Sequence, residues 1–276
     1  MPRSYPAVGA ALAGLSFVAL ASAKESSPVT MDTVWSYAAS NQPLEAQAAL
    51  SEVETVDERT QALAEAVLAM ARPPLSESDW AKIEPQLAQL AQGDDDIAAQ
   101  ALYLQARMHQ VQKAEPDQAR AEALYDELAR RWPESHWTQL GYVKLGLTKL
   151  FAGDDATPPR ARLATAEALL AKVTEPPLRR DLQLQIGWAA LEYDLPLDEV
   201  LPHLIAADAV GGLMGITPED LLIQIGELSF RAGHLGQAQH YLERLLAEFP
   251  TSTRNYNVRQ RLAEIRQALA APGGGA

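Results

Sequence analysis

Apolar residues along most of the chain recur three and four positions apart, the spacing of helices with one buried face. Ala and Leu, both strong helix formers, are abundant, and aromatic residues make up only 6% of the sequence. The pattern predicts an all-α chain with little or no strand. Helices are expected over about residues 31–40, 44–53, 56–71, 97–113, 117–132, 136–151, 160–173, 178–193, 197–207, 218–232 and 235–249.

Two further helices are marked by their ends. Ser76 opens the first, and Asp79 three residues later resembles a capping box; Pro85 predicts a kink in this helix or its true start. Its apolar face comprises Trp80, Ile83, Leu87 and Leu90. The second follows residue 253, and its apolar face comprises Val258, Leu262, Ile265 and Leu269.

From residue 96 onward the expected helices form pairs, with a turn signal between the two members of each pair. In the clearest pair Gly226, Ala238 and Pro250 recur at intervals of twelve. Small side chains let two antiparallel helices approach closely, and a proline stops the second helix before the next pair. Thr217 is expected to cap this pair's first helix, with Pro218 at its first helical position.

This pair resembles a tetratricopeptide repeat. The matching residues are Leu222, Ile225, Gly226, Gly233, Ala238, Tyr241 and Pro250, and an earlier partial match comprises Ala121, Tyr125 and Pro133. The resemblance implies a right-handed superhelix, an α-solenoid, of antiparallel helix pairs over residues 96–253. Residues 24–95 would be degenerate repeats or a cap, and residues 254–276 a last capping helix with a flexible tail.

The middle of the chain departs from this pattern. Gly146, Gly187 and Gly226 are separated by 41 and 39 residues, which is longer than the roughly 34-residue period of ideal repeats. Twelve residues after Gly187 stands Glu199, where a small residue is expected. The packing of that pair must therefore differ.

In this family the first helix of each pair lines a concave groove. The resemblance therefore implies a peptide-binding groove comprising Asp181, Leu184, Trp188, Glu192, Asp220, Ile223, Glu227, Phe230 and Arg231. An acidic groove with two aromatic rings would suit a peptide bearing basic and apolar residues. The alternative is that the two aromatic and two aliphatic side chains belong to the core between repeats, while the carboxylates are simply solvated.

The N-terminus predicts export. Residues 1–23 place Arg3 before an apolar run and end in Ala-Ser-Ala, which is typical of a signal peptide cleaved after Ala23; an uncleaved anchor is the alternative. The absence of cysteine excludes a lipid-modified cysteine and disulfides. No Asn-x-Ser/Thr glycan acceptor is present either, so a bacterial periplasm is the simplest compartment. Cleavage removes Arg3 and takes the net charge from −13 to −14, which disfavours nucleic acid and anionic lipid as partners.

The sequence offers no convergent set of catalytic or metal-binding residues. The five histidines are dispersed, and Gly93-Asp94-Asp95-Asp96 lacks the alternating ligands of a calcium loop, so a helix cap is expected there and again at 153–155. No cofactor is expected.

We therefore predict a non-enzymatic periplasmic scaffold that binds a protein or peptide. The alternative is an accessory or recognition domain for peptidoglycan metabolism or outer-membrane assembly, because exported bacterial proteins with such repeats include envelope-assembly factors. The oligomeric state stays open, and self-association is a third possibility.

Overall fold

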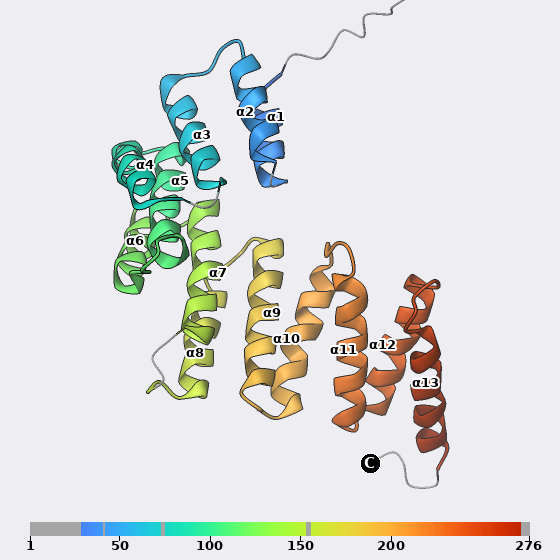
Figure 1. Cartoon of the computed structure of the whole chain (residues 1–276). Helices are drawn as coiled ribbons and strands as arrows, with labels where there is room; N and C mark the ends of the chain where they lie inside the picture. The colour runs from blue at the N-terminus through green and yellow to red at the C-terminus, as the bar shows by residue number, and fades with distance from the viewer. Residues whose placement is uncertain (1–28, 41, 73–74, 153–155, 272–276) are drawn as a thin grey trace, which may run out of the picture. The chain divides into compact units, whose positions relative to one another are not determined.

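A computed structural model describes residues 29–40, 42–72, 75–152 and 156–271. Within these residues the chain forms thirteen α-helices and one π-helix and contains no β-strand, which confirms the all-α prediction (Figure 1). The predicted signal peptide, the expected cap at 153–155 and the tail at 272–276 lie outside the described residues. No described helix is long and apolar enough to cross a membrane.

The chain divides into two compact units, with the boundary between Val56 and Asp57. The described part of the first unit contains α1 (Met31–Ala39) and α2 (Pro43–Glu52), which pack against each other. Val34 of α1 and Ala46 of α2 are fully buried.

The second unit holds the remaining helices. They are α3 (Glu58–Met70), α4 (Glu77–Leu90), α5 (Asp96–Arg107), the π-helix η1 (Met108–Gln112), α6 (Gln118–Arg131), α7 (His136–Phe151), α8 (Pro159–Leu170), α9 (Pro176–Glu192), α10 (Leu197–Val210), α11 (Thr217–Arg231), α12 (Leu235–Glu248) and α13 (Asn255–Ala270). Each α-helix packs against the next one along the chain, and α5 and α9 also contact α7. Because α3 and α4 pack against α5, they belong to the same compact unit as the later helices.

Local chemistry at the start of α4 agrees with the sequence. The Ser76 hydroxyl accepts a hydrogen bond from the Asp79 amide, and the Asp79 carboxylate accepts one from the Ser76 amide at 2.9 Å. The expected apolar face is buried, and Pro85 lies inside the helix rather than at its start. On α13 the apolar face is also buried, except that Leu269 is exposed.

The expected close approach of α11 and α12 is present. A Cβ atom added to Gly226 would lie 2.6 Å from Cδ2 and 2.7 Å from Cγ of Leu242, and 3.7 Å from the carbonyl oxygen of Ala238. Ala238 and Leu242 are both fully buried. A side chain at residue 226 would therefore clash with Leu242, which lies one helical turn after Ala238, the residue at the spacing of twelve.

Helices α9 and α10 also approach closely at a glycine, but with one extra residue between this glycine and the start of the second helix. A Cβ atom on Gly187 would lie 2.7 Å from Cδ2 of Leu204, but α10 begins ten residues after Gly187, whereas α12 begins nine after Gly226. The extra residue places Val200, fully buried, at the position facing α9 and leaves Glu199 exposed. Gly146 differs, because its added Cβ would meet Leu182 of α9 at 2.6 Å rather than a residue of α8.

The start of α11 corrects the sequence prediction. Thr217 is already helical, the capping position is Ile216, and no side chain caps the helix. The two carboxylates of the first turn are instead used by the segment before α13, because Glu219 accepts a hydrogen bond from Ser252 at 2.5 Å and Asp220 pairs with Arg254.

Candidate functional site

Trp188 is the most prominent of the predicted groove residues. Although α9 packs against α7, α8 and α10, the Trp188 side chain is 42% exposed. Its indole Nε1 donates a hydrogen bond to Oε1 of Gln224 on α11 at 3.1 Å. The ring is thus fixed between α9 and α11, with much of its surface in solvent.

The groove residues at the end of α11 are held by α13. Arg261 Nε lies 3.0 and 3.1 Å from the two carboxylate oxygens of Glu227, and its guanidinium lies 4.3 Å from the ring centroid of Phe230. Phe230 is half-buried as a result, whereas Arg231 at the end of the helix is exposed.

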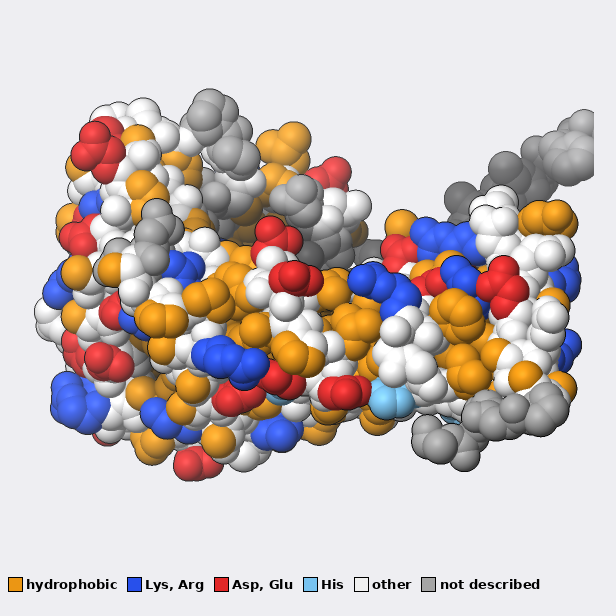
Figure 2. Space-filling model, turned by 90° about the horizontal axis from the view of Figure 1, so that it is seen from below, with side chains coloured by type: hydrophobic (Ala, Val, Ile, Leu, Met, Phe, Trp, Pro, Cys, Tyr) orange, Lys and Arg blue, Asp and Glu red, His pale blue; other side chains and the backbone are white. Residues whose placement is uncertain are grey.

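The carboxylates expected to make the groove acidic are mostly neutralised within the chain. Asp220 pairs with Arg254, Glu227 with Arg261, and Asp181 with Arg180 at 2.8 Å, while Glu192 is exposed. On the face drawn in Figure 2, acidic and basic side chains likewise lie close together among hydrophobic ones. The expected surplus of negative charge is therefore small.

The two aliphatic members of the predicted set differ in exposure. Leu184 is buried and belongs to the core, in line with the alternative interpretation of this stripe. Ile223 on α11 is half-buried.

Sequence reasoning missed an apolar stripe on α7. Lys144, Leu147 and Phe151 stand at positions i, i+3 and i+7 and so share one helical face. Leu147 and Phe151 are 44% and 47% exposed. The spacing alone could have found this stripe.

Contacts between α7 and α9 advance in the same order along both helices. Gln139 Oε1 accepts from the amides of Thr174 and Glu175 just before α9, the space beside Gly146 is filled by Leu182, and the carbonyl of Leu150 accepts from Tyr193. Phe151 and Trp188 therefore lie at about the same level of two neighbouring helices. We call the four side chains Leu147, Phe151, Trp188 and Lys144 the α7–α9 face.

Lys144 gives this face its charge. Its side chain is half-buried; that burial and then the positive charge of Arg107 on α5 lower the pKa of Lys144, and Asp181 on α9 offsets them only in part. Among the described residues no carboxylate forms an ion pair with Lys144, while Asp181 is bound by Arg180. The α7–α9 face thus joins exposed apolar side chains to a cation between α5 and α9.

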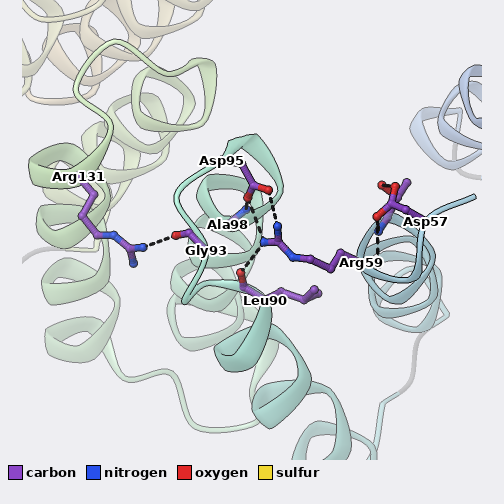
Figure 3. A network of polar contacts seen from close by, with 8 residues as sticks. Asp57, Arg59, Leu90, Gly93, Asp95, Ala98 and Arg131 are labelled. Carbon is purple, nitrogen blue, oxygen red and sulfur yellow. Dashed lines mark hydrogen bonds and ion pairs between the residues drawn. The ribbon is translucent and has the colours of Figure 1, made fainter.

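The acidic run before α5 serves a structural role. Asp95 caps α5 by accepting from the Ala98 amide at 3.0 Å, and Arg59 of α3 contacts the same carboxylate and the carbonyl of Leu90 (Figure 3). Arg131 of α6 donates to the carbonyl of Gly93 at 2.6 Å. This agrees with the expected helix cap, and no group of three His, Asp or Glu residues in the described part of the chain is arranged to hold a metal ion.

The histidines lie apart from one another. His109, His136 and His234 each contact a different carboxylate, which belongs to Glu84, Glu175 and Asp198 respectively. No family model matches the chain, and no curated protein or solved structure is detectably similar to it.

Proposed function

We propose that the chain is a non-enzymatic scaffold that binds a segment of another protein on the first helices of its pairs. The observation that carries the proposal is the α7–α9 face, where Phe151 and Trp188 stand exposed at one level of two adjacent helices. Large aromatic side chains held rigidly in solvent are typical anchors of protein interfaces, because they bury much area at little entropic cost. Trp188 is held in this way by Gln224.

The proposed architecture is a right-handed superhelix of antiparallel helix pairs, of the tetratricopeptide type. Contacts at α11 support it: Gly226 meets Leu242 and Ser229 bonds Gln237, so one helix ascends as the other descends. Contacts from α11 to α13 instead ascend together, from Asp220–Arg254 to Glu227–Arg261. In such an array the first helices line one continuous surface.

The proposed compartment is the bacterial periplasm, which rests on the signal-like pattern of residues 1–23. The partner would then be an envelope protein or peptide rather than nucleic acid, since the net charge of −13 repels a polyanion.

The test is capture of partners from the cell envelope fraction, with residues 24–276 as bait, read by mass spectrometry. The double variant Phe151→Ala with Trp188→Ala should lose a partner that the parent retains. Tyr256→Ala is the matched control, because Tyr256 is an aromatic residue 70% exposed on α13. If the double variant, folded by circular dichroism, keeps every partner, the proposed groove is wrong.

The exposed rings of Phe151 and Trp188 also favour a second candidate function, because aromatic rings can stack on sugars. This candidate is an accessory or recognition domain for peptidoglycan metabolism or outer-membrane assembly. Sedimentation with purified peptidoglycan separates the two. A protein-binding scaffold should stay in the supernatant, whereas a glycan-binding domain should pellet and should lose this property in the double variant.

A further inference from the structure

Two cations stand together on the first helices at the edge of the α7–α9 face. Arg107 closes α5, and its Nη1 donates to Oε1 of Gln110 at 2.5 Å. Lys144 lies on the neighbouring helix α7, and the same Gln110 side chain donates from Nε2 to the Lys144 carbonyl oxygen at 2.9 Å, so the two residues are joined through Gln110. In the described structure neither side chain forms an ion pair with a carboxylate, although the whole chain carries 36 acidic residues against 23 basic ones.

This arrangement is unfavourable without a partner. A half-buried ammonium loses hydration, and a second cation nearby adds repulsion. The shift in the pKa of Lys144, caused first by burial and then by Arg107, reflects both effects. An anion beside Lys144 would relieve the repulsion, and Asp181 does not supply one because Arg180 binds its carboxylate at 2.8 and 2.9 Å.

The apolar part of the face sets what the anion is attached to. Leu147 and Phe151 follow Lys144 along the same stripe of α7, and Trp188 on α9 lies at about the level of Phe151. A free inorganic anion would leave these three side chains in water. A peptide that carries both apolar and acidic side chains would cover them and reach the cations at once.

We propose that the α7–α9 face binds an apolar peptide segment through an Asp or Glu side chain held by Lys144 and Arg107. The inference rests on the proposed scaffold function and names the chemistry of its partner. It reverses the basic partner expected from the sequence, because Asp220 and Glu227 are already engaged by Arg254 and Arg261.

The experiment is selection from a random dodecapeptide library displayed on phage, with residues 24–276 as target. The parent, Lys144→Glu, Lys144→Met and Trp188→Ala are compared, each checked for folding by circular dichroism. Lys82→Glu is the matched control, since Lys82 is an exposed lysine on α4, away from this face. Selected peptides are then synthesised and their affinities measured by fluorescence anisotropy.

The parent and Lys82→Glu should enrich peptides that combine apolar residues with Asp or Glu, and Lys144→Glu should lose this preference. A selected acidic peptide should bind Lys144→Met roughly tenfold more weakly than the parent, the ratio expected for one lost charged hydrogen bond. Two results would overturn the inference but not the proposed binding groove. In the first, enrichment depends on Trp188 but the selected peptides carry no acidic residues; in the second, Lys144→Glu enriches the same peptides as the parent. If no peptide is enriched beyond the Trp188→Ala variant, the scaffold function itself is contradicted, and this inference with it.

Discussion

Replacement of Gly226 by alanine tests the closest contact between α11 and α12. The added methyl group would lie 2.6 and 2.7 Å from two carbons of Leu242, where carbon atoms normally rest about 3.5–4.0 Å apart. Leu242 is fully buried and cannot swing into solvent, so the helices must separate or the leucine must leave its rotamer. Such overpacking costs about 1–3 kcal/mol.

Alanine also favours helix over glycine by about 1 kcal/mol, which opposes the clash. We therefore expect Gly226→Ala to lower the free energy of unfolding by up to about 2 kcal/mol. Gly236→Ala is the matched control, because nothing lies within 4 Å of an added Cβ near the start of α12. That variant should be neutral or stabilised by up to about 1 kcal/mol.

A double-mutant cycle isolates the contact. Leu242→Ala alone should cost about 2–5 kcal/mol through the cavity it leaves. In that background the methyl group at residue 226 meets no obstacle, so Gly226→Ala should become stabilising by up to about 1 kcal/mol. The assay is urea unfolding followed by circular dichroism, with the slope compared among variants to check that the transition stays cooperative. If Gly226→Ala stabilises the parent as much as Gly236→Ala does, the close approach is refuted.

Three further predictions concern a turn, a histidine and an arginine. Asp194 follows α9 with a φ of 54°, and Gly233 follows α11 with a φ of 82°. In thermal unfolding, Asp194→Gly should raise stability by about 0.5–1 kcal/mol and Gly233→Ala should lower it; effects of the same sign in both variants would refute this. Burial lowers the pKa of His203 below its usual 6.5, with Glu167 offsetting part of the shift. The unfolded chain then binds the proton more readily, so the free energy of unfolding should fall as pH drops below about 6.5, and less so in His203→Gln; an equal fall in His203→Gln and in the parent would contradict this. Arg261→Ala should cost about 1 kcal/mol in urea unfolding through its contacts with Phe230 and Glu227, and a similar loss in the exposed Arg259→Ala would argue against those contacts.

The features of the fold that could be predicted are those set by neighbouring residues. The caps at Ser76 and Asp95 depend on side chains that bond amides three residues away. The sequence identified Ser76 and placed the second cap within the run from Gly93 to Asp96. Gly226 could be identified because Ala238 and Pro250 follow it at intervals of twelve. Thr217 shows the limit, since a residue of good capping type became helical while the first turn of α11 served the segment before α13.

The π-helix after α5 shows a second limit. The pattern predicts one continuous helix to residue 113, but Gln110 is buried, donates to the carbonyl of Lys144 on α7 at 2.9 Å and accepts from Tyr125 on α6 at 2.8 Å. These partners lie 34 and 15 residues away. Local periodicity carries no information about contacts at such separations.

Helical spacing indicates which side chains of the candidate site share one helical face, but it does not indicate their ion pairs. The arginines that neutralise Asp220 and Glu227 come from 34 residues further along the chain.

The contacts at the corner between α4 and α5 should make α3 and α6 unfold together. In a linear array each helix pair touches only its neighbours, so the ends can melt while the middle stays folded. At this corner Arg59 of α3 holds the carbonyl of Leu90, and Arg131 of α6 holds those of Ala91 and Gly93. If α3 or α6 unfolds, carbonyl groups at this corner lose their arginine donor. The backbone amides from α3 to α6 should therefore exchange with solvent hydrogen at a common rate. The segment from α3 to α6 would then unfold as a single cooperative block.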